Sequence, residues 1–119
     1  MALAVSRHDL LDTEIRKCGN DHALVMLDGE LDVSTAGSLY EQFAELAKEG
    51  IKHVALNLAE LDFIDSVGLS VIITEHKRVD SMGGELIIFA PKDRVRKVLQ
   101  LAGLDRYLHI RPESRSHGG

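Results

Sequence analysis

Short hydrophobic runs alternate with helix-like patterns along most of the chain. Two runs rich in Ile, Val and Leu, residues 13–18 and 22–27, flank Gly19-Asn20-Asp21, a cluster that favours the positive φ angles of a tight turn. They predict a β-hairpin. Residues 51–58 are apolar enough to predict a central parallel strand buried on both faces, and residues 85–90 predict the next strand.

Three segments repeat apolar residues at the spacing of an α-helix. The first follows Ser34 or Thr35, either of which is placed to cap it, the second starts at Ser66, and the third spans about residues 92–102. A glycine suited to ending a helix follows each segment. The predicted inward positions are Leu39, Phe43, Leu46 and Ala47 in the first, Leu69, Ile72, Ile73, His76 and Val79 in the second, and Val95, Val98, Leu99 and Ala102 in the third.

This order of elements predicts an α/β fold with a mixed sheet. Right-handed crossovers make strands that alternate with helices parallel, while the opening hairpin adds an antiparallel edge. Residues 107–110 predict a short final strand or turn. We expect one domain over residues 13–111, preceded by a lead-in at 1–12 and followed by a disordered tail at 112–119.

Composition narrows the classes of function. The chain has 119 residues and a formal net charge of −5, with no Trp, three Phe and two Tyr, which argues against a nucleic-acid surface. From this length we expect a single domain and not a large multidomain enzyme. No apolar run approaches the roughly 20 residues that cross a bilayer, and residues 1–5 lack the basic leader and long apolar core of a secretory signal. We therefore expect a cytoplasmic protein.

The residues that bind metals or cofactors form no recognisable motif. Cys18 is the single cysteine, so no internal disulfide forms, and we expect its side chain to be buried, apolar and redox-silent. The six histidines are scattered, which predicts no metal site, and phosphate-binding glycine loops are absent. We expect no cofactor. His76 lies on the apolar side of its helix, where a satisfied imidazole is the simpler interpretation.

One segment, residues 61–69, carries a strand into a helix at the sheet edge where ligands and partners usually bind. Ser66 is placed there as an N-cap, which is a sufficient structural role. The alternative is that its hydroxyl points outward, that Gly68 leaves its surroundings open, and that unpaired amides and the helix dipole stabilise an added phosphate. No nucleophile elbow surrounds Ser66, because Ile64 stands where a glycine is needed.

Four motifs in order give the chain a specific resemblance: Gly29-Glu30-Leu31-Asp32, Val54-Ala55-Leu56-Asn57-Leu58, Asp65-Ser66-Val67-Gly68-Leu69 and Gly103-Leu104. From about residue 13 to residue 110 the sequence resembles the STAS domain of bacterial anti-sigma factor antagonists. The resemblance implies a four- or five-stranded mixed sheet flanked by helices. It also implies a small adaptor that binds an anti-sigma factor with a histidine-kinase-like ATPase fold, which is a serine kinase.

The resemblance implies roles for particular residues. Ser66 matches the serine that the kinase phosphorylates, Asp65 precedes it, and Asp32 lies on a neighbouring loop used in partner contact. The unphosphorylated protein would free a sigma factor, the phosphorylated protein would not, and a serine phosphatase would reverse the switch. Val67 and Ser70 depart from the small hydroxyl residue and the glycine that are common there. The implied partner-binding residues are Asp32, Ser34, Thr35, Asp65, Ser66, Val67, Gly68 and Leu69.

Two other classes of function stay open on the sequence. One is a STAS subunit of a lipid or anion transporter complex or of a stress-sensing scaffold. The other is a small enzyme that uses Ser66 as nucleophile with Asp65, Asp32 or His76 in support. Because the loops at residues 32–35 and 65–66 follow strands at the same sheet edge, we expect them to be neighbours in space.

Overall fold

The computed structural model describes residues 10–112, which form a five-stranded sheet in the order β1-β2-β3-β4-β5. β1 is antiparallel to β2, and every other neighbouring pair is parallel. This confirms the predicted α/β fold with a mixed sheet and an antiparallel hairpin edge. The strands are β1 (Leu11–Cys18), β2 (His22–Leu31), β3 (His53–Ile64), β4 (Glu85–Phe89) and β5 (His109–Arg111).

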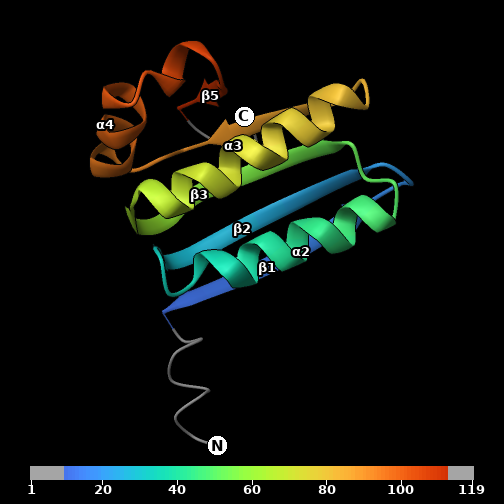
Figure 1. Cartoon of the computed structure of the whole chain (residues 1–119), viewed down its shortest axis with the longest axis horizontal. Coiled ribbons are helices and arrows are strands. Elements are labelled where there is room, and N and C mark those ends of the chain that lie inside the picture. Colours follow the sequence, from blue (N-terminus) through green and yellow to red (C-terminus); the bar gives the residue numbers. More distant parts are fainter. Residues whose placement is uncertain (1–9, 113–119) are drawn as a thin grey trace, which may run out of the picture.

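The three predicted helices are present as α2 (Ala36–Lys48), α3 (Ser66–Ser81) and α4 (Asp93–Leu101), and a 3-10 turn, η1 (Leu104–Arg106), follows α4. Figure 1 shows α2 and α3 lying side by side across one face of the sheet, which we call the helix face. None of the helices in residues 10–112 is long and apolar enough to cross a membrane.

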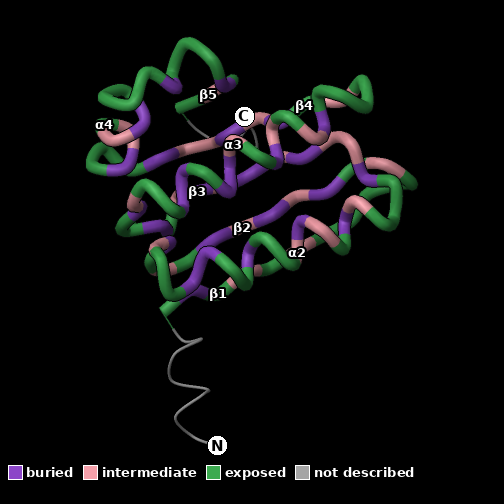
Figure 2. The backbone as a smooth tube through the Cα atoms, viewed as in Figure 1, coloured by how far each residue is buried: buried purple, intermediate pink, exposed green. Residues whose placement is uncertain are grey.

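The core lies between the helix face and these helices. Along the inner strands, buried residues alternate with half-buried ones, as the tube in Figure 2 shows. The prediction that residues 51–58 are buried on both faces is therefore wrong, because α2 and α3 both lie on the same face. The buried side chains of the sheet are Ala23, Val25, Leu27, Val54, Leu56, Leu58, Leu86 and Ile88, and the half-buried ones are Leu24, Met26, Ala55, Asn57, Ile87 and Phe89.

Two strands run further than the sequence pattern predicts. β2 continues to Leu31 and β3 to Ile64. The sequence pattern does not show the full length of β3, because two register shifts insert extra residues into this strand and break its alternation of apolar and polar positions. Asn57 Oδ1 accepts a hydrogen bond from the Ala59 amide, 2.9 Å away, beside the first shift. The extended strands carry residues 31–32 and 64–65 to the same edge of the sheet.

The structure describes residues 10–12 of the expected lead-in and residue 112 of the expected tail. β1 begins at Leu11, inside the expected lead-in. Residues 1–9 of that lead-in and residues 113–119 of the expected tail lie outside the described residues. Ala102, which the helical spacing placed inward, is exposed just after the end of α4.

Cys18 is exposed, so the prediction of a buried side chain is wrong. Successive side chains of a strand point to opposite faces, and in β1 Leu11 and Ile15 point to the helix face. Cys18 shares the other alternation with Glu14 and Arg16, so it lies on the face that α2 and α3 leave uncovered.

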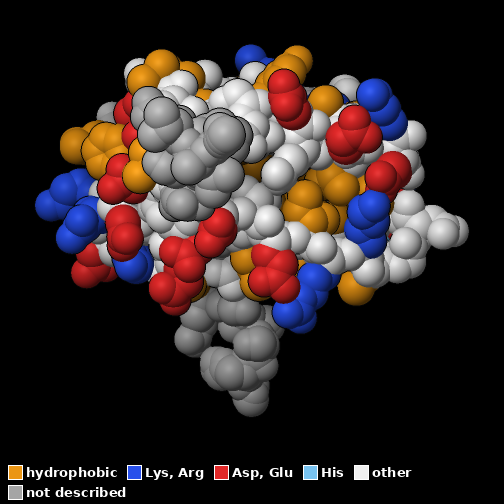
Figure 3. Space-filling model, turned by 90° about the horizontal axis from the view of Figure 1, so that it is seen from below, with side chains coloured by type: hydrophobic (Ala, Val, Ile, Leu, Met, Phe, Trp, Pro, Cys, Tyr) orange, Lys and Arg blue, Asp and Glu red, His pale blue; other side chains and the backbone are white. Residues whose placement is uncertain are grey.

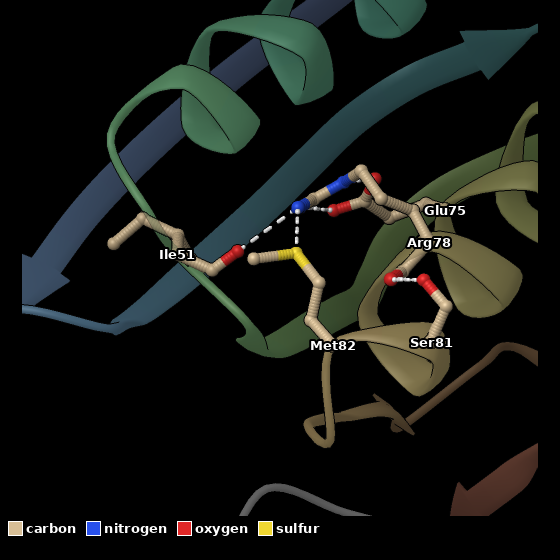
Figure 4. A network of polar contacts seen from close by, with 5 residues as sticks. All are labelled: Ile51, Glu75, Arg78, Ser81 and Met82. Carbon is tan, nitrogen blue, oxygen red and sulfur yellow. Dashed lines mark hydrogen bonds and ion pairs between the residues drawn. The ribbon is translucent and has the colours of Figure 1, made fainter.

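A buried ion pair joins α3 to the segment between α2 and β3 (Figure 4). The Arg78 guanidinium donates to both carboxylate oxygens of Glu75, at 2.8 and 2.6 Å, and to the Ile51 carbonyl at 3.1 Å. The Glu75 side chain is only 2% exposed. Burial raises the pKa of Glu75, and the neighbouring Arg78 opposes that rise. The ion pair with Arg78 therefore favours the ionised form of Glu75.

Candidate functional site

Two loops meet at the carboxyl ends of β2 and β3. The Asp65 amide donates to the Leu31 carbonyl at 3.1 Å, and the Val33 amide donates to Asp65 Oδ2 at 3.0 Å. These bonds join the loop between β2 and α2 to the start of α3, although the loops are more than thirty residues apart in sequence. The expectation that the two loops are neighbours is confirmed.

Asp65, not Ser66, caps α3. It has extended backbone angles, and its Oδ1 accepts hydrogen bonds from the Val67 and Gly68 amides, each at 2.9 Å. The prediction of Ser66 as the cap is wrong because the carboxylate one residue earlier takes those donors. The same bonds correct the expectation of unpaired amides for a phosphate, since two amides of the first turn are already occupied.

Ser66 is the first residue of α3, and its side chain is exposed. Within residues 10–112 its hydroxyl has no hydrogen-bond partner. Ser70, one turn later, differs because its hydroxyl donates to the Val67 carbonyl at 2.7 Å. The hydroxyl of Ser66 is thus presented to solvent by a backbone that Asp65 holds in place.

Gly68 permits close packing, which corrects the expectation that it leaves the surroundings of Ser66 open. A Cβ at this position would lie 2.7 Å from Leu31 Cγ and 2.8 Å from the Leu31 carbonyl oxygen. Gly68 is buried, and so is Leu69. Both support the surface around Ser66 from beneath.

Asp32 shapes the other loop. Its Oδ1 accepts hydrogen bonds from the Ser34 amide at 2.9 Å and the Ser34 hydroxyl at 2.7 Å. The hydroxyl bond is the main reason that the pKa of Asp32 is lowered, and burial opposes it. Asp32 is half-buried, whereas Ser34 is exposed.

Thr35 is only 4% exposed, and its side chain stabilises this loop through hydrogen bonds to the backbone. Its hydroxyl donates to the Glu30 carbonyl at 2.8 Å and accepts from the Asp32 amide at 3.0 Å. Thr35 occupies the N-cap position of α2 without a capping bond from its side chain. The predicted side-chain cap by Ser34 or Thr35 is therefore wrong, because both hydroxyls bond within the loop instead.

Each of the two joined segments carries an exposed apolar side chain. Val33 is 73% exposed, and Val67 is 40% exposed. The sequence interpretation placed the loop at residues 32–35 on the partner surface but did not name Val33, because an isolated valine in a loop fits neither a strand nor a helix pattern. Its neighbours Asp32 and Ser34, both typical of turns and caps, were the available signal that it stands outside the core.

His76 does not support Ser66 as a nucleophile. It lies ten residues further along α3, about 15 Å at the rise of an α-helix. Its ring packs edge-on against Tyr107 with centroids 4.9 Å apart. The expectation of a satisfied imidazole is wrong, since the buried Nδ1 of His76 has no hydrogen-bond partner in residues 10–112. No three metal-binding side chains of those residues converge.

Comparison of the sequence with models of protein families gives a match over most of the chain. The sequence model of the STAS domain family matches residues 14–117. The chain belongs to the STAS domain family. Among STAS relatives, the anti-sigma-B factor antagonist of Staphylococcus aureus NCTC 8325 is 29% identical over 86 residues, which are 72% of this chain and 80% of the relative. The anti-sigma F factor antagonist of Paenibacillus polymyxa is 33% identical over 88 residues, 73% of this chain and 75% of the relative.

Solved structures of STAS relatives share the fold. An anti-sigma factor antagonist from Mycobacterium paratuberculosis aligns with a TM-score of 0.72 and 22% identity, over 87% of each chain. The antagonist SpoIIAA in its unphosphorylated form aligns with a TM-score of 0.78 and 19% identity, over 90% of this chain and 92% of SpoIIAA. The phosphorylated form of SpoIIAA from Bacillus aligns with a TM-score of 0.71 and 18% identity, over 90% of this chain and 96% of that one. The resemblance stated from the sequence is confirmed.

Proposed function

We propose that this STAS protein is an anti-sigma factor antagonist of the cytoplasm. In its unphosphorylated form it binds an anti-sigma factor, a serine kinase with a histidine-kinase-like ATPase fold, and thereby releases a sigma factor. The names of its relatives, antagonists of anti-sigma-B and anti-sigma F factors, support the class of partner. The observation that carries the proposal is the exposed hydroxyl of Ser66, which has no hydrogen-bond partner within residues 10–112 and lies at the start of a helix that Asp65 caps.

Phosphorylation of Ser66 would switch the protein off. The serine oxygen forms a bond to the γ-phosphorus of ATP, the bond to the β,γ-bridging oxygen breaks, ADP leaves, and the hydroxyl proton passes to a base of the kinase. The product carries about −1.5 to −2 charge at pH 7. Because Asp65 already occupies the Val67 and Gly68 amides, that charge meets few free donors of the helix. A serine phosphatase would restore the hydroxyl by hydrolysis.

The partner would contact a small mixed surface around Ser66. Val33 and Val67 supply exposed apolar area, and Ser34 and the partly exposed carboxylates of Asp32 and Asp65 supply polar contacts. An added phosphate would bring bulk, like charge and a desolvation cost to this surface. Thr35, Gly68 and Leu69 are buried, so they contribute by holding the shape of the two loops.

The test is phosphorylation with mapping of the modified residue. Purified protein is incubated with ATP and each kinase of this fold encoded by the source genome, and the phosphopeptide is identified by mass spectrometry. We expect one phosphate on Ser66 and none on Ser66→Ala. Ser70→Ala is the matched control, because Ser70 is also exposed but lies one turn later. Phosphate on Ser70 or Thr74, or none with any such kinase, contradicts the proposal.

A further inference from the structure

The outer edge of β1 is unpaired within residues 10–112, because β1 ends the strand order and pairs only with β2. This edge is eight residues long, whereas β5 at the other end of the sheet has three. An unpaired edge strand presents backbone donors and acceptors that can bind a further strand. Figure 3 views the molecule from the side of β1 and shows hydrophobic side chains in a hollow flanked by acidic and basic ones.

The pairing with β2 decides which backbone groups of β1 point outward. The Glu30 amide donates to the Leu10 carbonyl at 2.7 Å, and the same register continues through Glu14 opposite Met26. Hydrogen-bonded and non-hydrogen-bonded positions alternate in an antiparallel pair. The even-numbered residues of β1 therefore direct their backbone groups to β2, and Thr13, Ile15 and Lys17 direct theirs to the free edge.

The charges of β1 are self-complementary about Ile15. In an antiparallel pair of two β1 strands with Ile15 on the two-fold axis, Glu14 of each copy faces Arg16 of the other, and Asp12 faces Cys18. Both charged side chains are available, since Glu14 is 60% and Arg16 67% exposed while they pair within one chain at 2.9 Å. Moving the axis to Glu14 or to Arg16 sets like charges directly opposite, which is destabilising. The charge pattern therefore selects one register.

We propose that two copies of this chain associate through β1 in this register, so that their two five-stranded sheets become continuous. Ile15 would pair with Ile15, and Thr13 with Lys17 twice, which gives about six backbone hydrogen bonds at two for each such pair. A two-fold axis makes the contact isologous and closed. Its small area makes the dimer weak and concentration-dependent. The proposal does not rest on the role of Ser66, which follows β3 and lies outside the contact.

Charge exchange tests the contact. Sedimentation of the full chain from about 10 μM to 1 mM should show a monomer–dimer equilibrium for the wild type. Glu14→Arg and Arg16→Glu should each weaken association at least tenfold, and the double variant should restore it. Arg94→Glu, on the exposed surface of α4, should leave it unchanged. Thermal unfolding of each variant at low concentration checks that the monomer is folded. A wild type that stays monomeric at 1 mM, or a folded double variant that stays as weak as the single ones, overturns the proposal.

Disulfide trapping tests the register. In the proposed dimer Asp12→Cys faces Cys18 of the second copy in a non-hydrogen-bonded pair, where side chains are closest. Six residues of strand separate positions 12 and 18 by about 20 Å within one chain, so the bond forms only between copies. Oxidation should convert Asp12→Cys to a covalent dimer through Cys18, faster than wild type or Glu14→Cys. Equal trapping of Asp12→Cys and Glu14→Cys would refute this register.

Discussion

Removal of the Asp65 carboxylate should loosen both loops of the site at once. Asp65→Ala loses the cap on the Val67 and Gly68 amides and the bond from the Val33 amide. A lost helix cap costs about 1 kcal/mol. A hydrogen bond to a charged group contributes roughly 1.5–3 kcal/mol, and the partial exposure of Asp65 places this bond at about 1 kcal/mol. We expect Asp65→Ala to lose about 2 kcal/mol of unfolding free energy.

The variant Asp65→Asn separates the contribution of the helix cap from that of the hydrogen bond with the Val33 amide. The amide oxygen of Asn can still cap α3, but its NH₂ group would face the Val33 N–H, so this variant should lose only about 1 kcal/mol. Asp93→Ala is the matched control, because Asp93 also lies in the first turn of a helix but is 99% exposed. Its effect should stay below about 0.5 kcal/mol. Urea unfolding followed by circular dichroism measures all three. An Asp65→Ala variant as stable as Asp93→Ala would refute the reasoning.

Three further predictions concern other parts of the structure and are tested by unfolding. Gly68→Ala should lose about 1–3 kcal/mol through overpacking, whereas Gly37→Ala, whose Cβ meets nothing within 4 Å, should be neutral or slightly stabilising; equal effects contradict the packing argument. Arg78→Met leaves the Glu75 carboxylate buried without its partner and should cost about 3–5 kcal/mol at pH 7. Since burial raises the pKa of Glu75, that loss should shrink as pH falls and the carboxyl is protonated; a loss independent of pH contradicts it. The lowered pKa of Asp32 stabilises the fold above the ordinary value of 3.8 and less as pH falls below it, so Asp32→Asn should lose less stability than wild type on acidification; parallel acid curves would show otherwise.

The sequence predicts the sheet and helices where one face of an element is clearly apolar. Alternation identifies the β1–β2 hairpin, and the helical spacing from Leu69 to Val79 identifies α3. The extent of β3 was missed because its register shifts interrupt the alternation after Asn57. The exposure of Cys18 could have been predicted from the sequence, since alternation in β1 places Cys18 on the same face as the charged residues Glu14 and Arg16.

The sequence predicts where the site lies, but it does not predict which residue caps α3 or how Gly68 packs. Asp65 and Ser66 are both good helix caps, and local sequence does not choose between them. The bond that fixes Asp65 comes from Val33 on a distant loop. The role of Gly68 likewise depends on Leu31, the last residue of β2, which lies against it. Contacts between distant segments determine these details, and a single sequence does not show them.

The proposed switch at Ser66 is tested most directly by the affinity for the anti-sigma kinase before and after phosphorylation. Isothermal titration calorimetry compares unphosphorylated protein, protein stoichiometrically phosphorylated on Ser66, and Ser66→Ala, with circular dichroism on each. We predict that the unphosphorylated protein and Ser66→Ala bind equally and that phosphorylation weakens binding about 100-fold, roughly 3 kcal/mol, with the fold intact. Unchanged affinity of the folded, phosphorylated protein would contradict the proposed switch.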